Sequence, residues 1–172
     1  MFEKWYPDER CDTAYEIDYA GWRKRGKKAL LFDVDNTLVR HGAAADMRSR
    51  ELFRKLRELG YGTCIISNNK EPRVRSFAQS VGSKYVFKAN KPSPEGYIKG
   101  CRLLGALPSE TLFIGDQIFT DIWGARRAGI YSILVKPIHP LEEIQIILKR
   151  RLEWFVLRAY EKDMQKLKTN GK

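Results

Sequence analysis

Cysteine is scarce in this sequence, which argues against two ways of holding a small fold together. Its 3 cysteines, Cys11, Cys64 and Cys101, are far apart along the chain and odd in number. They suit neither a framework of disulfide bonds nor a zinc site made of cysteine pairs. We therefore expect a reduced, cytoplasmic protein in which Cys64 is a small core residue and not a nucleophile.

Long apolar runs are absent as well. No stretch of the 172 residues approaches the length of about 20 apolar residues that a helix needs to cross a bilayer. The first ten residues, MFEKWYPDER, also lack the apolar segment of a secretory signal. Any contact with a membrane is therefore expected to be peripheral, at its inner face.

Acidic residues are too few to balance the basic ones. The chain has 32 Lys and Arg against 21 Asp and Glu, so its formal net charge is +11. Such an excess favours an anionic partner: a phosphate ester, a nucleic acid or an acidic membrane surface. The other proportions, 43% hydrophobic and 31% charged residues, are ordinary for a soluble globular protein. The length suits one domain, residues 1–172.

Strand-like and helix-like segments alternate in the middle of the chain. Short apolar runs predict five strands, at residues 29–32, 63–66, 85–87, 111–114 and 131–135. Segments that each end before a glycine predict helices at residues 48–59, 72–81, 94–104 and 121–128. This alternation predicts an α/β fold in which helices cover both faces of a parallel sheet. We expect residues 1–28 to wrap around the sheet, 29–136 to form the catalytic core and 140–168 to form a terminal amphipathic helix.

The sequence LLFDVDNTLV, residues 30–39, places two carboxylates at the end of the first predicted strand. In an extended chain, residues two apart point to the same side, so Asp33 and Asp35 are aimed at one place. Like charges this close usually need a bound cation, a shared proton or a functional reason. The pair suits phosphoryl transfer, in which one carboxylate attacks phosphorus, the other moves a proton and a hard metal ion screens both.

The ends of the other predicted strands carry polar residues too, namely Ser67, Asn68, Asn69, Lys91, Gly115, Asp116 and Asp121. A parallel sheet brings these strand ends to one rim. We expect Asp33 to form an aspartyl phosphate while Asp35 acts first as acid and then as base. The Ser67 hydroxyl would hold phosphate oxygens, and Lys91 would offset negative charge.

An oxygen site for Mg²⁺ is expected at the same rim. Its ligands would be Asp33, Asp35, Asp116 and Asp121, although Asp121 could instead cap the helix that follows it. Neighbouring polar residues would either bind the substrate phosphate or support the turns around it; these are Asn36, Thr37, Asn68 and Asn69.

These segments resemble, in the same order, the four motifs of the haloacid dehalogenase superfamily: DxDxT at 33–37, Ser67, Lys91 and GDxxxxD at 115–121. The sequence is similar in particular to the YqeG-type subfamily, which includes bacterial phosphatases and mitochondrial phosphatidylglycerophosphate phosphatases. That similarity lies in the segments YPDE, DVDNTLV, ISNN, KANKP and GDQIFTD. The resemblance implies a three-layer Rossmann-like fold with strand order 3-2-1-4-5. It also implies that Asp35 would bind Mg²⁺ through its backbone carbonyl.

Members of this superfamily often carry a cap domain after the first or the second motif. From Asp35 to Ser67, and from Ser67 to Lys91, the sequence has room for only about one helix and one strand. We therefore expect no cap. An open site suits a bulky phosphorylated substrate, such as a lipid head group at a membrane, a protein or a nucleic-acid end.

Two basic regions lie outside the motifs. Residues 23–28, RKRGKK, enter the first predicted strand at its amino end, away from the expected site, so nucleic acid is not the partner we favour. In residues 140–168 an apolar stripe that includes Phe155 and Ala159 would face the sheet, which leaves Trp154, Leu157 and others elsewhere. Either a second copy of the chain or an anionic membrane would cover them.

The sequence therefore predicts Mg²⁺-dependent hydrolysis of a phosphomonoester. The subfamily resemblance makes phosphatidylglycerophosphate the preferred substrate and a membrane the preferred partner of the terminal helix. Two alternatives stay open: a phosphatase for nucleotide, sugar or protein phosphates, and a binding or assembly module with a vestigial catalytic shell.

Overall fold

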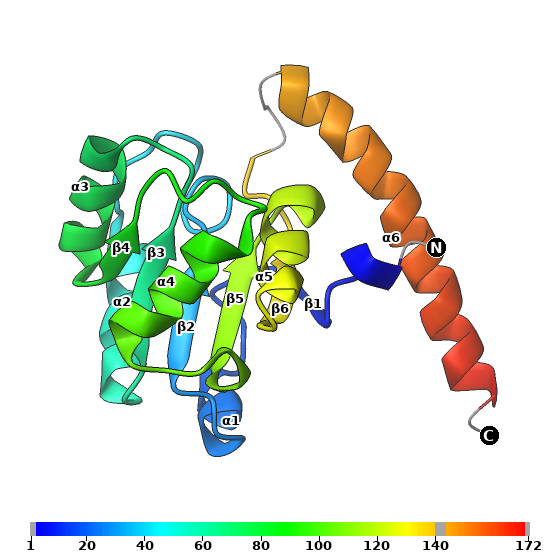
Figure 1. The fold of residues 1–172 in the computed structure, drawn as a ribbon, viewed down its shortest axis with the longest axis horizontal. Helices are drawn as coiled ribbons and strands as arrows, with labels where there is room; N and C mark the ends of the chain where they lie inside the picture. Colours follow the sequence, from blue (N-terminus) through cyan, green and yellow to red (C-terminus); the bar gives the residue numbers. More distant parts are fainter. Residues whose placement is uncertain (1–2, 140–143, 171–172) are drawn as a thin grey trace.

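Six parallel strands form one sheet at the centre of the molecule (Figure 1). A computed structural model describes residues 3–139 and 144–170, and in the last helix the side chains of residues 153–166. In spatial order the strands are β1 (Glu9–Cys11), β6 (Tyr131–Val135), β5 (Thr111–Gly115), β2 (Ala29–Phe32), β3 (Gly62–Ile66) and β4 (Lys84–Val86). The five expected strands are therefore present in the order 3-2-1-4-5, and the α/β fold class is confirmed.

The predicted number of strands was wrong by one. Residues Glu9–Cys11 add an edge strand, paired in parallel with β6 so that Glu9 lies opposite Ile133. Its three residues, ERC, contain no apolar run, and short polar strands are common at sheet edges because they discourage further pairing. Only its partner, far along the chain, makes this segment a strand.

The strands divide their side chains between two helical layers. In β2 all four residues are buried, with Leu30 and Phe32 on one face and Leu31 on the other. The first face packs against α1 (Tyr19–Lys24), α2 (Met47–Glu58) and α3 (Glu71–Val81). The second packs against α4 (Pro94–Leu104) and α5 (Trp123–Arg127). The result is a three-layer α/β/α arrangement, with short helical turns η1 (Glu3–Trp5), η2 (Pro108–Glu110) and η3 (Ile118–Ile122) in its loops.

Glycines end the helices where the sequence indicated. Gly82 and Gly105 follow α3 and α4 with φ of 68° and 63°, a left-handed conformation that glycine adopts without strain. The helix predicted at 121–128 instead begins as the π-helical turn η3, which carries Asp121, and continues as α5.

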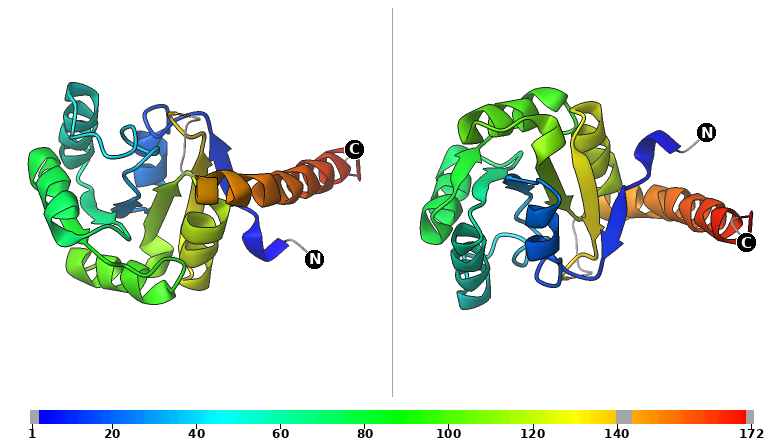
Figure 2. Two further views of the ribbon diagram at one scale, coloured as in Figure 1. Left: turned by 90° about the horizontal axis from the view of Figure 1, so that it is seen from above. Right: turned by 90° about the horizontal axis from the view of Figure 1, so that it is seen from below.

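The last helix, α6 (Ile144–Asn170), lies beside the β1 edge, and its C-terminal half projects beyond the rest of the molecule (Figure 2). The predicted stripe was wrong in phase: Phe155 is 57% exposed, whereas Glu153 and Val156 are buried. The reason is that α6 packs on η3 and η1 and not across the sheet. The expected helix start at residues 140–143 lies outside the described residues. Among the residues described, no helix is both long enough and apolar enough to span a bilayer.

Candidate active site

The carboxyl ends of the central strands bring the sequence motifs together. Asp33 directly follows β2, Ser67 follows β3 and Asp116 follows β5, while Lys91 reaches in from the loop after β4. All strands run in parallel, so these ends share one rim of the sheet. Each of these four residues is at most 8% exposed, so the group lies beneath the surface.

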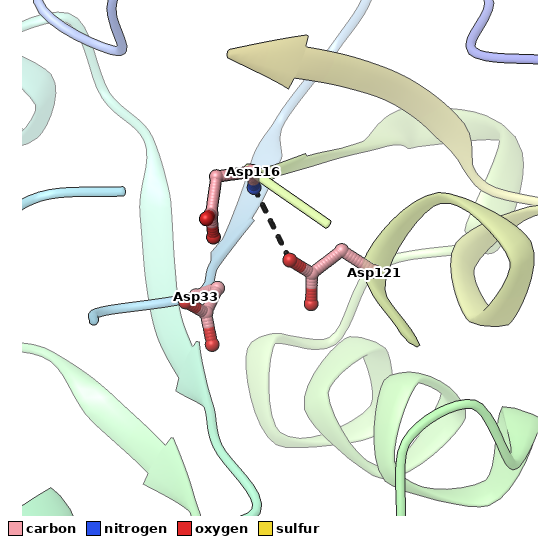
Figure 3. A group of neighbouring side chains, drawn as sticks. All are labelled: Asp33, Asp116 and Asp121. Atoms are coloured by element: carbon pink, nitrogen blue, oxygen red, sulfur yellow. Dashed lines mark hydrogen bonds between the residues drawn. The ribbon is translucent and has the colours of Figure 1, made fainter. Parts of the chain in front are cut away.

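Three carboxylates converge at this rim (Figure 3). Asp33, Asp116 and Asp121 each offer an oxygen, and these oxygens lie within 4.8 Å of one another. Thr37 Oγ1 donates to Asp116 Oδ1 at 3.0 Å and lies 3.4 Å from Asp33 Oδ2. Buried like charges at such distances repel strongly, and an all-oxygen donor set is the kind that hard divalent cations prefer. The cluster is therefore able to hold a metal ion.

Lys91 supplies the positive charge next to this cluster. Its Nζ lies 2.5 Å from Asp33 Oδ1 and 2.7 Å from Asp121 Oδ1. Burial alone would lower the pKa of Lys91, but the carboxylates of Asp121 and Asp33 outweigh it and hold that pKa well above its ordinary value. Asn68 fixes the loop, since its side-chain amide both accepts from Lys91 N at 2.7 Å and donates to Lys91 O at 3.2 Å.

The environment of Asp33 disfavours its charged form. Burial raises the pKa of Asp33 to about 8, and the nearby charges of Asp121 and Asp116 act in the same direction, while Lys91 opposes them. A cation bound between the carboxylates would shift the balance back toward ionised Asp33.

Asp121 connects the lysine to the end of β5. Its Oδ2 accepts from the backbone N–H groups of Asp116 at 3.2 Å and Gln117 at 3.0 Å. This approach requires Gly115, because a Cβ there would lie 2.6 Å from the Asp121 carboxylate. The residue lies inside η3, so it does not occupy the N-cap of α5, where Ile122 stands.

The carboxylate of Asp35 lies outside the acidic cluster and has its own partners. Asn69 Nδ2 donates to Asp35 Oδ2 at 2.6 Å, while Gly42 N and Arg73 Nη2 donate to Oδ1 at 2.8 and 3.0 Å. The turn between the motif residues closes through Asn36, whose N–H donates to Val39 O at 2.7 Å. The contacts with Asn69, Gly42 and Arg73 orient the Asp35 carboxylate, whereas the Asn36 bond closes the backbone turn.

The remaining predicted phosphate contacts have protein partners in the structure. Ser67 is buried, and its Oγ accepts from Asn69 N at 3.2 Å. Asn68 and Asn69 bind Lys91 and Asp35 through their side chains, so both support the neighbouring functional groups.

One buried carboxylate beside the site, that of Glu153, could not be recognised from the sequence. It extends from α6 and accepts from Ile118 N at 2.8 Å and from Phe119 N at 3.4 Å, in the turn between Asp116 and Asp121. Within a basic amphipathic segment, a single glutamate reads as surface charge. Only the docking of α6 on η3 gives it a role.

Comparison with known proteins agrees with this arrangement. A family model described as haloacid dehalogenase-like hydrolase matches residues 48–129. The chain is 31% identical over 164 residues to the probable phosphatase YqeG of Bacillus subtilis (strain 168), covering 94% of this chain and 95% of that protein. The chain belongs to the haloacid dehalogenase superfamily. It is a phosphatase of the YqeG type within that superfamily.

Two further likenesses bear on this YqeG-type phosphatase. It is 26% identical over 156 residues to phosphatidylglycerophosphate phosphatase 1 of Arabidopsis thaliana, covering 84% of this chain but only 44% of that protein. The crystal structure of a haloacid dehalogenase superfamily hydrolase from Ehrlichia chaffeensis superposes with a TM-score of 0.53 at 18% identity, covering 77% of this chain and 98% of that chain. The structural likeness shows the fold alone.

The YqeG-type chain has no cap at either position where the superfamily often carries one. Only α2 and β3 lie between Asp35 and Ser67, and only α3 and β4 lie between Ser67 and Lys91. Both intervals belong to the described part of the chain. The absence of a cap at these two positions is therefore confirmed.

Proposed function

We propose that this phosphatase hydrolyses phosphatidylglycerophosphate to phosphatidylglycerol, with Mg²⁺ and through an aspartyl phosphate on Asp33. The observation that carries the proposed chemistry is the buried contact of Asp33 with Lys91 beside Asp116. Support for the lipid comes from the name of the Arabidopsis relative, from the net charge of +11 and from the uncapped site. A phosphorylated substrate follows from membership of the phosphatase family.

The reaction would proceed in two balanced steps. Asp33 attacks phosphorus and forms an acyl phosphate, while Asp35 donates a proton to the departing alcohol oxygen. Asp35 then removes a proton from water, which attacks the acyl phosphate, releases inorganic phosphate and restores Asp33. The partners of Asp35, Asn69 and Arg73, hold its carboxylate in place for both transfers.

Charge stabilisation in both steps would fall to the groups around Asp33. Lys91 offsets the negative charge of the transferred phosphoryl group, and Ser67, Asn36 and Thr37 would bind its oxygens. Mg²⁺ would be held by Asp33, Asp116, Asp121 and the backbone carbonyl of Asp35, and it would supply positive charge at the phosphoryl oxygens. The oxygen-only donor set fits that ion.

The chemistry is tested with a generic aryl phosphate. Wild-type protein should release phosphate in the presence of Mg²⁺, and Asp33→Asn should lose that activity because the amide cannot act as the nucleophile. Equal rates for wild type and variant would rule out the catalytic proposal. A folded protein with no turnover on any phosphate ester would favour the binding or assembly module.

The substrate is tested with a panel of esters. The proposal predicts faster hydrolysis of phosphatidylglycerophosphate in micelles than of glycerol 3-phosphate, nucleotides, sugar phosphates or a phosphopeptide. A preference for any of these soluble esters would replace the lipid with that class.

The exposed aromatic face near the middle of α6 is the surface we propose for peripheral membrane contact. Trp154 and Phe155 are 51% and 57% exposed, and Arg158 lies over the Trp154 ring at 4.9 Å. Aromatic and basic residues side by side are favoured at the interface of an anionic bilayer. A second copy of the chain is the alternative occupant.

A further inference from the structure

The two carboxylate oxygens of Asp35 accept different numbers of hydrogen bonds. Oδ1 accepts two, from Gly42 N at 2.8 Å and from Arg73 Nη2 at 3.0 Å, whereas Oδ2 accepts one, from Asn69 Nδ2 at 2.6 Å. Each carboxylate oxygen has two lone pairs, so within the described part of the chain Oδ1 is fully occupied and Oδ2 is not. The position left for a proton is therefore on Oδ2.

Arg73 reaches Asp35 from the first turn of α3. Pro72 stands at the start of that helix, and the neighbouring Val74 and Phe77 are buried, so the turn is anchored in the core. The guanidinium carbon of Arg73 lies 5.8 Å from the centre of the Phe77 ring. The guanidinium group therefore approaches Asp35 from a fixed direction.

The backbone that carries Asp35 is fixed as well. The next residue, Asn36, has a φ of 64°, a left-handed conformation that asparagine tolerates better than most residues, and its N–H donates to Val39 O at 2.7 Å. Asp35 itself pairs with Val39 in an isolated parallel bridge. With its Cα held by this turn and its Oδ1 held by Arg73 and Gly42, the carboxylate can point its Oδ2 in only one direction.

The contact of Arg73 with Asp35 differs from the other arginine pair of α3, that of Arg75 with Glu71. The side chains of Arg75 and Glu71 are 51% and 41% exposed, and their charged atoms are 3.9 Å apart. Those of Arg73 and Asp35 are 25% and 14% exposed, and their charged atoms are 3.0 Å apart. Exposed pairs contribute little, whereas shielded hydrogen bonds between charged groups are stronger and more directional. The pair of Arg75 therefore provides a control for that of Arg73.

We propose that Arg73 is a positioning residue that, together with Gly42, reserves Oδ2 of Asp35 for proton transfer. This assignment rests on the proposed phosphatase function and names the atom that acts in it. In the first step Asp33 bonds to phosphorus, the bond from phosphorus to the alcohol oxygen breaks, and the proton on Oδ2 passes to that oxygen. In the second step water bonds to phosphorus, the bond to Asp33 breaks, and Oδ2 takes a proton from the water.

Loss of Arg73 should affect the two steps according to the leaving group. Without the guanidinium group Oδ1 has a free lone pair, so the carboxylate can turn and the proton can bind the wrong oxygen. Phenol leaves slowly unless a proton reaches it, whereas p-nitrophenol leaves readily as its anion. The first step should therefore slow for phenyl phosphate and not for p-nitrophenyl phosphate. The second step should slow for both esters, because they form the same acyl phosphate.

The first measurement is the ratio of kcat/KM for phenyl phosphate to kcat/KM for p-nitrophenyl phosphate, with Mg²⁺ present. Arg73→Met keeps an apolar side chain against Phe77 but removes the charged donor, and this ratio should fall about 10- to 100-fold. Arg75→Met makes the same change two residues away and should keep the wild-type ratio. If circular dichroism shows that Arg73→Met is not folded, Arg73→Gln, which also lacks the charge, decides by the same measurements.

The second measurement is the time course of p-nitrophenol release in stopped flow. In Arg73→Met the acyl phosphate should form at nearly the wild-type rate but break down slowly, so kcat should fall. Release should then begin with a burst of about one equivalent per active site. A purely structural defect would slow both steps and give no burst.

Two results would overturn the positioning role of Arg73. One is an unchanged ratio in the folded variant, and the other is an equal loss for both esters without a burst. The proposed function fails on different evidence: a wild-type protein that hydrolyses neither ester, or an Asp33→Asn protein as active as the wild type.

Discussion

At the scale of single residues, the arrangement around Lys91 places two carboxylates on one ammonium group in a buried site. Lys91 Nζ contacts both Asp33 and Asp121, and Asp116 adds a third acid close by. One lysine cannot neutralise three carboxylates. The site therefore carries excess negative charge until a cation or a proton joins it.

This imbalance makes the stability of the metal-free protein depend on pH. The pKa of Asp33 is raised by burial to about 8 from its ordinary 3.8, so between these values the folded protein keeps a proton that the unfolded chain has released. Stability should therefore fall as pH rises from about 4 to about 8, by at most about 1.4 kcal/mol per pH unit. Urea unfolding with EDTA at a series of pH values measures the slope.

Mg²⁺ and Asp33→Asn give the matched controls for that slope. Mg²⁺ binds the ionised carboxylates, so its stabilising effect should be larger at pH 8 than at pH 5. Asp33→Asn has no proton to release, and its stability should vary less with pH over the same window. A wild-type slope identical to that of the variant would contradict the assignment.

The sequence indicated the acidic and basic residues of the site but not their supports. Asp33, Ser67, Lys91 and Asp116 follow apolar runs that predict buried strands, so their convergence could be derived from topology. The contact of Arg73 with Asp35 depends on how α3 packs, and the contact of Glu153 depends on how α6 docks. Neither the packing of α3 nor the docking of α6 can be predicted from the local sequence pattern.

At the scale of elements, the turn from β5 into η3 depends on one close approach. A methyl group at Gly115 would lie 2.6 Å from the Asp121 carboxylate, so Gly115→Ala must displace that residue and its contact with Lys91. We expect the free energy of unfolding to fall by about 1–3 kcal/mol. The Mg²⁺ concentration for half-maximal activity should rise at least about tenfold, because the displaced Asp121 binds the ion less well. Chemical denaturation and activity against Mg²⁺ concentration measure the two effects.

Gly105→Ala is the matched control for that substitution. No heavy atom lies within 4 Å of a Cβ there, and φ is 63°, so only the conformational cost of about 1–2 kcal/mol applies. Its Mg²⁺ dependence should equal that of the wild type. A similar defect in both variants would show that general destabilisation explains the result.

The docking of α6 on η3 should act on the metal site through Glu153. Glu153→Ala leaves the N–H groups of Ile118 and Phe119 without this acceptor, at a cost of about 1–3 kcal/mol, and frees the turn that carries Asp121. The Mg²⁺ concentration for half-maximal activity should rise severalfold. Glu153→Gln, which keeps an accepting oxygen, should recover most of it, and Lys162→Ala on the exposed side of α6 should change nothing.

The elements themselves were predictable to different degrees. Strands β2, β3, β5 and β6 are short apolar runs, and helices α2 to α4 end at glycines. The hydrophobic pattern and the glycines were therefore sufficient to predict these elements. Edge strand β1 and the π-helical turn η3 both make contacts with segments far away in the sequence, β1 with β6 and η3 with Glu153 of α6. The prediction of which face of α6 is buried was wrong for the same reason, because the packing of a few α6 residues against η3 determines that face.

At the scale of the whole molecule, a net charge of +11 and an exposed aromatic pair on a projecting helix predict salt-dependent binding to anionic vesicles. Raising NaCl from about 0.05 to about 0.5 M should weaken binding, because the Debye length falls to a few ångströms. Trp154→Ser with Phe155→Ser should weaken it at both salt concentrations. Vesicles of phosphatidylcholine alone are the control.

The oligomeric state in solution distinguishes the two partners proposed for the exposed face of α6, a membrane and a second copy of the chain. If vesicle binding is unaffected by the double substitution but ultracentrifugation shows a dimer that the substitution disrupts, a second copy covers the helix. A monomer that binds anionic vesicles supports the membrane.

The edge strand has a consequence for how the chain is made. Asp8 and Ser132, whose contacts fasten β1 to β6, are 124 residues apart. At about 5–20 residues per second, a ribosome needs about 6–25 seconds to synthesise the stretch between them. During that time the N-terminal segment has no strand to join, while β2 and β3 are already available to pair. The outermost strand of the sheet is thus the first to be synthesised and among the last to find its neighbour.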